Sequence, residues 1–342
     1  MNTPVRTSTT RVSADGLTQS QHLFKRQIGL TLVEMMVAMA ISLLIALAAV
    51  SALIVARQGF TTVDVSSQLR DNARFSADLV QRLAVQAGYQ DDLFASKKAS
   101  TAEKEDANIA PGVYGFNNAL LSTTAPLTES TQRSEDNGSD ILILRYQTAE
   151  TFPGSGTADG SIIDCSGQSP SAVATSKGDS IYSILHVATV GNEPSLMCTY
   201  LDSATNTVTT VPIVQGVESF QVLYGVDNVV DGKTDSVPDE YVRADEEKLG
   251  NASATNENWR RVRSLRIGMV LRGAANSLLE KPAEDETFYA FGKGTNSAGG
   301  APGSALSPGD DDPGTEFKPD FDGRLRMTST FTVHLRNDQA LD

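Results

Sequence analysis

The amino-acid sequence predicts an α+β protein, in which a long N-terminal helix precedes an antiparallel β-rich head. Three observations support this fold class. Residues 35–56 carry no charge, residues 61–87 repeat apolar side chains at helical spacing, and the chain beyond residue 89 alternates in short runs. The 342 residues are enough for one or two domains with a buried core.

The uncharged run from Met35 to Ala56 predicts a transmembrane helix. At about 1.5 Å per residue the run spans roughly 33 Å, which exceeds the hydrocarbon core of a typical bilayer. Neither proline nor glycine interrupts residues 30–56. A cleaved secretory signal fits less well, because its apolar region is shorter and ends at a small-residue cleavage site.

Charge is distributed unevenly along the chain. Residues 1–29 carry a net charge of +3 and the remaining residues a net charge of −17, which gives −14 for the whole chain. Basic residues before an apolar segment favour a cytoplasmic N-terminus, so the single span would place the rest of the chain outside. The acidic body argues against a nucleic-acid-binding surface.

Glu34 stands at the head of the apolar run, where an acid is costly. A carboxylate at the centre of a membrane helix costs about 2.5–3.5 kcal/mol on insertion scales, and less near an end. Glu34 could be a helix N-terminal acid that the macrodipole stabilises, or it could be retained for a partner cation. Its local chemistry leaves both interpretations open.

Residues 25–34 read KRQIGLTLVE. This stretch resembles the class III signal of type IV prepilins, which has basic residues, a glycine, and an apolar helix with glutamate as its fifth residue. Glu34 is the fifth residue from Leu30. The resemblance implies that a membrane-embedded prepilin peptidase cuts between Gly29 and Leu30 on the cytoplasmic side and methylates Leu30. Two features depart from the pattern: Leu30 replaces the usual phenylalanine, and the 29-residue leader is long.

The same resemblance gives Glu34 a role in assembly. In prepilin-like proteins this glutamate is thought to pair with the N-terminal amine of a neighbouring subunit. An isolated charge in hydrocarbon is costly, and a paired charge is much less so. We therefore expect residues 30–56 to serve as an intersubunit element as well as a membrane span.

Residues 57–90 are predicted to continue the helix as an amphipathic half. Its apolar side chains recur at mostly helical spacing, and Gly88 offers a C-terminal cap. A separate helix after a break at Gly59 is the alternative. The predicted inward-facing residues are Leu69, Ala73, Val80, Leu83, Ala84 and Ala87.

Residues 91–342 are predicted to form the exported β-rich head. In the last predicted strand, Phe331, Val333 and Leu335 share one face. Residues 292–323 are rich in Gly, Ser, Pro and Asp, which is typical of a flexible surface loop. The predicted strands cover residues 139–147, 180–190, 195–201, 217–226, 262–272, 287–291 and 329–337.

Four stretches of the head extend the resemblance: VQGVESFQVLYGVD, DSVPDEYV, WRRVRSLRIGMVLR and DGRLRMTSTFTVHLRN. In this order they resemble the PilW-type minor pilins across roughly residues 210–340. The resemblance implies a complex with other minor pilins and the major pilin that primes pilus assembly, sits at the pilus tip and supports a tip-associated adhesin. The expected location is the bacterial inner membrane, with the head in the periplasm, and then the pilus tip.

Cys165 and Cys198 are the two cysteines of the chain. A closely spaced metal-binding set is absent, which argues against zinc. If the head is exported, the pair predicts one disulfide, and closing a loop of about 34 residues would contribute roughly 3–4 kcal/mol. Two buried reduced thiols are the alternative.

The segment DNVVDGKTDSVPDE, residues 227–240, is the best candidate for a metal site. It brings Asp227, Asp231, Asp235 and Asp239 close together in the sequence, and three of them fit an EF-hand loop. Two other ligand positions of that loop are Val and Pro here. We therefore keep calcium as a hypothesis beside a solvated acidic turn, and expect no other cofactor.

The basic cluster around residue 265 invites a nucleic-acid interpretation, but it alternates with apolar residues. The alternation predicts a strand with Leu265, Ile267, Met269 and Leu271 inward and the arginines exposed, able to pair with acidic groups. The basic residues concerned are Arg260, Arg261, Arg263, Arg266 and Arg272.

Catalytic motifs have little support. No nucleophile elbow is present, His22 lies in the leader, and His186 and His334 fall in predicted strands, as surface or satisfied core residues. The sequence therefore predicts a structural protein and not an enzyme. A pseudopilin of a type II secretion system shares the N-terminal signal and is the alternative within this class. From a different class, the alternative is a membrane-tethered binding protein or enzyme whose span is only an anchor.

Overall fold

The computed structural model describes residues 29–91, 109–132, 138–203, 205–228, 235–245, 248–250, 256–278, 286–292 and 316–337. The predicted leader before residue 29 with His22, Asp231, and residues 293–315 of the predicted flexible loop lie outside these ranges. The chain divides into two units, Met1–Ala56 and Arg57–Asp342, which are described separately.

Helix α1 (Leu32–Gln86) carries both predicted helical halves without a break at Gly59. The alternative of two separate helices is therefore wrong. Within the first unit, every side chain from Leu30 to Ala56 is exposed, and most of them are large and apolar. By length and composition, α1 is able to cross a membrane. So large an exposed apolar surface indicates a segment that lipid or other protein chains surround.

In the second unit, residues 57–86 of α1 pack one face into the core of the head. All six predicted inward-facing residues are buried there, and Val65 and Ser76 extend the face. Ser76 is accommodated in the core because its hydroxyl donates to the Asn72 carbonyl at 2.8 Å. The predicted cap is also confirmed: Gly88 follows the helix at a φ of 73°, a conformation that glycine adopts without strain.

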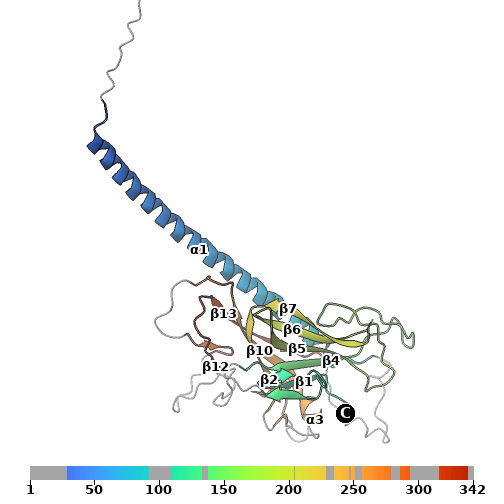
Figure 1. Ribbon diagram of the computed structural model, residues 1–342. Helices are drawn as coiled ribbons and strands as arrows, with labels where there is room; N and C mark the ends of the chain where they lie inside the picture. Colours follow the sequence, from blue (N-terminus) through green and yellow to red (C-terminus); the bar gives the residue numbers. More distant parts are fainter. Residues whose placement is uncertain are drawn as a thin grey trace, which may run out of the picture. The chain divides into compact units, whose positions relative to one another are not determined.

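The head contains two antiparallel sheets that share this core (Figure 1). The first has the strand order β1 (Val113–Phe116), β4 (Ile141–Tyr146), β5 (Ile181–Val190), β6 (Glu193–Asp202) and β7 (Thr207–Gln215). The second has the order β13 (Arg326–His334), β10 (Val262–Arg272), β8 (Val217–Val226) and β9 (Glu240–Val242). The smaller elements are β2 (Ala119–Leu121) with β3 (Ser130–Gln132), β11 (Phe288–Tyr289) with β12 (Glu316–Phe317), and the short helix α3 (Asn256–Trp259).

All seven predicted strands are present, and β8 and β10 have the predicted bounds. The alternation predicted for β13 is also confirmed, since Phe331, Val333 and Leu335 face the core between exposed neighbours. Sequence reasoning missed β7, which contains Pro212. β7 is an edge strand, and an edge is where a sheet tolerates the missing N–H of proline.

Strand β10 lies at the centre of the second sheet and pairs with both β8 and β13. Its four predicted inward residues are fully buried, as expected. The prediction of exposed arginines is wrong: Arg260 and Arg263 are buried, and Arg261, Arg266 and Arg272 are only partly exposed. Arg263 donates from Nε to Asp227 at 3.0 Å, and Arg260 donates to the carbonyl of Ile109 at 2.6 Å. These partners allow two cations to be buried.

A cluster of three arginines and three carboxylates joins the two sheets. Arg272 of β10 donates to Glu193 of β6 at 3.0 Å and to Glu218 of β8 at 3.2 Å. Arg326 of β13 binds Glu218 through two nitrogens, at 2.6 and 3.0 Å. The cluster consists of Arg272, Arg324, Arg326, Glu193, Glu218 and Asp322.

Two carboxylates of this cluster have lowered pKa values. Burial raises the pKa of Glu193, but hydrogen bonds from Arg324 and Arg272 outweigh it and leave the pKa below its ordinary value. Burial likewise raises the pKa of Asp322, but hydrogen bonds from Arg326 and the Arg324 backbone, together with the charges of Arg326 and Arg272, outweigh that effect and leave the pKa below its ordinary value. Both groups therefore stabilise the folded head in their ionised form.

The buried face of α1 predicts a large stability effect at Leu83. Leu83→Ala should lower the free energy of unfolding by about 2–5 kcal/mol, because it removes a fully buried side chain. Arg82→Ala, on the exposed face of the same turn, should change it by less than about 0.5 kcal/mol. Denaturant unfolding of the full chain in detergent measures both. Equal effects would contradict the observed helix orientation.

The salt-bridge cluster predicts a pH dependence. Because the folded pKa values of Glu193 and Asp322 are lowered, their stabilisation is present above the ordinary values of about 4.3 and 3.9 and is lost as pH falls through the folded values. Other carboxylates titrate in the same range, so the measured quantity is the difference between wild type and the double variant Glu193→Gln, Asp322→Asn. We expect the wild type to lose more stability than the variant between pH 6 and pH 3. If the stability of wild type and variant fell equally with pH, the stabilising role of the two carboxylates would be contradicted.

Candidate functional site

The segment before α1 holds the predicted processing site. Gly29, Leu30 and Thr31 precede the helix, and Leu30 is 80% exposed. Among the described residues other than its chain neighbours, none has an atom within 4 Å of the position that a side chain on Gly29 would occupy. The Gly29–Leu30 peptide bond therefore lies outside the hydrogen-bond ladder of α1, in an open position that a peptidase is able to reach. Cleavage there stays a prediction.

Thr31 and Glu34 cap the first turn of α1 reciprocally. The Glu34 carboxylate accepts from the Thr31 backbone N–H at 2.9 Å and from its hydroxyl at 3.0 Å. The Glu34 N–H in turn donates to the Thr31 hydroxyl at 3.2 Å. This arrangement is a capping box, which satisfies two backbone donors that a helix start leaves unpaired. Sequence reasoning missed it, although the T-x-x-E spacing before an apolar run was the available signal.

The cap uses only one oxygen of the Glu34 carboxylate. Both hydrogen bonds from Thr31 end at Oε2, and no described residue donates to Oε1. A carboxylate oxygen that is free in this way can accept a further hydrogen bond from a cation. The two interpretations of Glu34 are therefore compatible: the acid starts the helix with one oxygen and can receive a partner with the other.

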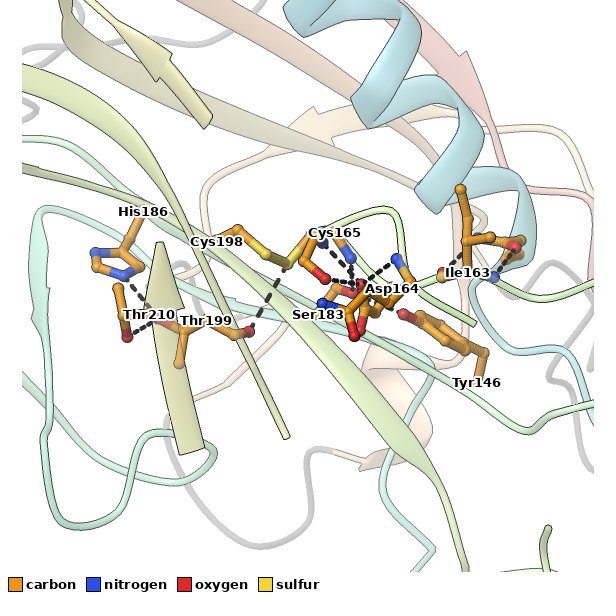
Figure 2. The surroundings of a disulfide bond; sticks show 12 residues. Tyr146, Ile163, Asp164, Cys165, Ser183, His186, Cys198, Thr199 and Thr210 are labelled. Atoms are coloured by element: carbon orange, nitrogen blue, oxygen red, sulfur yellow. Dashed lines mark hydrogen bonds between the residues drawn. A yellow bond between two sulfur atoms is a disulfide. The ribbon is translucent and has the colours of Figure 1, made fainter. Parts of the chain in front are cut away.

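The predicted disulfide between Cys165 and Cys198 is present, and both cysteines are buried (Figure 2). It ties the segment between β4 and β5 to strand β6. The Cys165 N–H donates to the Ser183 hydroxyl at 2.9 Å, and that hydroxyl lies 2.6 Å from the Tyr146 hydroxyl. Burial raises the pKa of Tyr146, so the phenol stays neutral in this network.

The segment that Cys165 anchors also holds the end of α1. The Gln86 side chain donates to the carbonyl of Ile163 at 3.1 Å and accepts from its N–H at 3.0 Å. Figure 2 shows Ile163 beside the last turn of the helix and close to the disulfide. Only Asp164 therefore separates the residue that contacts the helix from the cysteine that is linked to β6.

The structure gives the predicted calcium ligands other partners where it describes them. Asp227 is fully buried, and its carboxylate accepts from the Arg263 side chain and from two backbone N–H groups. Asp235 and Asp239 accept from nearby backbone N–H groups. Among the described residues, no group of three or more His, Cys, Asp or Glu could hold a metal. Asp231 lies outside the described residues, so the calcium hypothesis stays a prediction.

The two histidines of the head occupy the kinds of position that the sequence indicates. His186 is buried, with Nε2 at 3.0 Å from the Thr199 hydroxyl, which in turn lies 2.7 Å from the Thr210 hydroxyl (Figure 2). His334 is exposed on β13. One histidine thus belongs to a polar network inside the first sheet, and the other lies on the surface of the second.

Two family matches cover the regions just described. Residues 181–337 match the family described as Type IV Pilus-assembly protein W, and residues 24–50 match the prokaryotic N-terminal methylation motif. No curated protein matches the chain. Among solved structures, the type IV-like pilin TTHA1219 from Thermus thermophilus is similar over 80% of this chain and 98% of its own, at 12% identity and a TM-score of 0.35. The first match spans β5 to β13, and the second includes Gly29, Leu30 and Glu34.

The disulfide predicts a measurable contribution to stability. Replacing both cysteines, Cys165→Ser with Cys198→Ser, should lower the free energy of unfolding by about 3–4 kcal/mol, because the unfolded chain regains the freedom of a long loop. Denaturant unfolding in detergent with and without a reducing agent measures the effect. Reductant should destabilise the wild type and leave the variant unchanged. A wild type that reductant does not affect would contradict the prediction.

Proposed function

Because the two family matches make this chain a PilW-type, prepilin-like protein, we propose that it is a structural minor pilin of a type IV pilus, processed after Gly29 and incorporated through α1. One observation carries this proposal. An exposed Gly29–Leu30 bond precedes a long apolar helix, and Glu34 caps that helix while keeping one oxygen free.

Hydrolysis of the Gly29–Leu30 bond creates a positive charge that is able to pair with the Glu34 carboxylate. The amide is neutral before the cut; afterwards Gly29 ends in a carboxylate and Leu30 begins with an amine. That amine is protonated at neutral pH, and methylation keeps its charge. An ammonium group in the membrane is costly alone, and so is a carboxylate. Pairing the Leu30 amine of one subunit with the Glu34 Oε1 of the next removes much of both costs.

The rest of the proposal concerns the place of the chain in the pilus. Before assembly it is a single-pass protein of the bacterial inner membrane, with its head in the periplasm. The disulfide supports this location, because such bonds persist in an oxidising compartment. In the pilus it acts with other minor pilins and the major pilin to prime assembly, and it stays at the tip, where it supports a tip-associated adhesin.

The proposed role is structural and not catalytic. The membership of the PilW-type family supports this view. The alternative of a type II secretion pseudopilin explains the N-terminal motif equally well, but the PilW match over the head favours the pilus. The alternative of a tethered binding protein or enzyme needs neither cleavage at Gly29 nor a free oxygen on Glu34.

Two substitutions at Glu34 separate its capping role from its pairing role. Glu34→Gln keeps an oxygen for the Thr31 cap and removes the charge, whereas Glu34→Val removes both. We expect both variants to insert and to be processed. We expect both to lower piliation by tenfold or more, because an uncompensated buried amine costs about 3–5 kcal/mol. Immunoblots of the membrane and sheared-pilus fractions measure insertion and piliation. Normal piliation with Glu34→Gln would contradict the proposed pairing between the Glu34 carboxylate and the Leu30 amine.

A further inference from the structure

Strand β13 forms one edge of the second sheet and has unused backbone groups. Among the described strands it pairs only with β10, in a register that runs without a bulge from Arg326 to His334. The Leu335 N–H donates to the Arg263 carbonyl of β10 at 2.8 Å. Because antiparallel pairing alternates, the odd-numbered residues bond to β10 and the even-numbered residues direct their N–H and C=O groups away from the sheet. No described residue forms a backbone hydrogen bond with these outward groups of Thr328, Thr330, Thr332 or His334.

The other three edges of the two large sheets are protected against a further strand. β1 has four residues and β9 has three, so neither offers a long row of backbone groups. β7 has nine residues, but Pro212 interrupts its row of N–H groups. Short edge strands and proline are two devices by which proteins block pairing at a sheet edge. β13 also has nine residues and contains no proline, so among the described strands it is the edge that stays open to pairing.

The core beneath the β13 edge is only partly covered. Val333 is buried, but Phe331 and Leu335, which face the same side, are partly exposed. The core-facing residues of the central strand β10 are by contrast fully buried. A further strand beside β13 would cover the apolar side chains at this edge with alternate residues of its own.

The other face of β13 carries basic side chains that have no acidic partner among the described residues. Arg266 of β10 lies opposite Thr332 and donates to its hydroxyl at 3.2 Å, whereas the buried Nε of Arg266 has no hydrogen-bond partner there. His334 and Arg336 are exposed on this face, and neither bonds to a described side chain. Other arginines of this sheet and its ends are paired with carboxylates, namely Arg263, Arg272, Arg324 and Arg326.

We propose that the edge of β13 receives an extended segment of a different pilus protein by β-strand addition, and that this segment alternates apolar and acidic side chains. The backbone of the segment bonds to the even-numbered residues of β13. Its apolar side chains pack beside Phe331, and its carboxylates meet Arg266, His334 and Arg336. In naming a pilus protein as the source of the segment, the inference rests on the proposed function.

Charge favours a different chain over a second copy of this one. Two β13 edges side by side would gather Arg266, His334 and Arg336 of both copies on one face, where like charges are destabilising. An acidic segment instead compensates the charges of this face. Electrostatic matching of this kind gives specificity more than affinity, and the backbone hydrogen bonds of an added strand supply affinity.

A defined peptide tests strand addition in vitro. The probe is a labelled nine-residue peptide that alternates valine and glutamate, and fluorescence anisotropy measures its binding to the full chain in detergent. We expect Thr332→Pro to weaken binding by about tenfold or more, because it removes an N–H that points outward and none that bonds to β10. The matched control Thr332→Val keeps that N–H and should bind nearly as well as wild type.

Altered peptides test the same bonds without changing the fold of the protein. N-methylation of alternate peptide groups removes N–H donors from the probe and should weaken binding by about tenfold or more. A valine–lysine peptide should bind more weakly than the valine–glutamate peptide. Arg336→Glu should reduce this preference, and Arg82→Glu, on the exposed face of α1, should leave it unchanged. Equal binding of the methylated peptide or of the lysine peptide would overturn the proposal.

Photo-cross-linking in a piliated host tests the source of the segment. The full chain carries a photoreactive residue in place of Thr328 or, as the control, in place of Val208 on the β7 edge. We expect position 328 to be joined to a different pilus protein, within a segment that alternates apolar and acidic residues. Thr332→Pro should lower the yield of this product about tenfold, and Thr332→Val should leave it unchanged. A product that joins two copies of this chain, or equal yields at both positions, would overturn the proposal.

These outcomes distinguish the inference from the proposed function. Processed chains in normal pili that give no cross-link at position 328 would overturn the inference and leave the proposed function standing. Chains that keep residues 1–29 and form no pili would overturn the proposed function. In that case the peptide assay would still decide whether the β13 edge binds an added strand, because it needs neither processing nor pili.

Discussion

The burial of one face of α1 is the constraint on which the head depends. Residues from Val65 to Ala87 supply a strip of side chains that both sheets pack around, and the same strip fixes which charges point outward. The strip ends at Gly88, whose left-handed conformation stops the helix and whose N–H donates to the Arg145 carbonyl of β4 at 2.8 Å. The end of the helix is therefore held by a strand of the sheet that it covers.

The end of α1 is connected to both sheets of the head through a short chain of contacts. Gln86 binds Ile163, Cys165 is covalently joined to β6, and Glu193 at the start of β6 binds Arg272 of β10 and Arg324, which lies just before β13. A helix, a disulfide and a salt-bridge cluster thus join the two sheets.

Glu34 shows how one residue can meet two requirements. A helix that starts in a membrane interface needs its first N–H groups satisfied, and Oε2 serves that need. An assembly element needs a charge that recognises a partner, and in our proposal Oε1 serves that need. The neutral amide before the cut and the ammonium after it would make the pairing depend on processing.

Much of the fold followed from periodicity, and the exceptions have physical reasons. Leu69 to Ala87 and the apolar residues of β10 repeat at the spacing of their elements, so their burial was predictable. Strand β7 was not predicted because it contains Pro212. A strand tolerates proline at the edge of a sheet, and the local sequence does not reveal that β7 is an edge strand. Arg263 was expected at the surface, because its partner Asp227 precedes it by 36 residues and is brought close only by pairing of β8 with β10. At the candidate site, a motif indicated Gly29, Leu30 and Glu34, whereas the reciprocal cap between Thr31 and Glu34 was missed although its T-x-x-E spacing stands in the sequence.

The central claim is that the chain works as an assembly subunit whose N-terminus is made by cleavage. Intact-mass analysis with N-terminal sequencing of the native protein tests it most directly. The account predicts a chain that begins at Leu30 with a methylated amine and contains the Cys165–Cys198 bond. A native chain that retains residues 1–29 in cells with an active prepilin peptidase would contradict it.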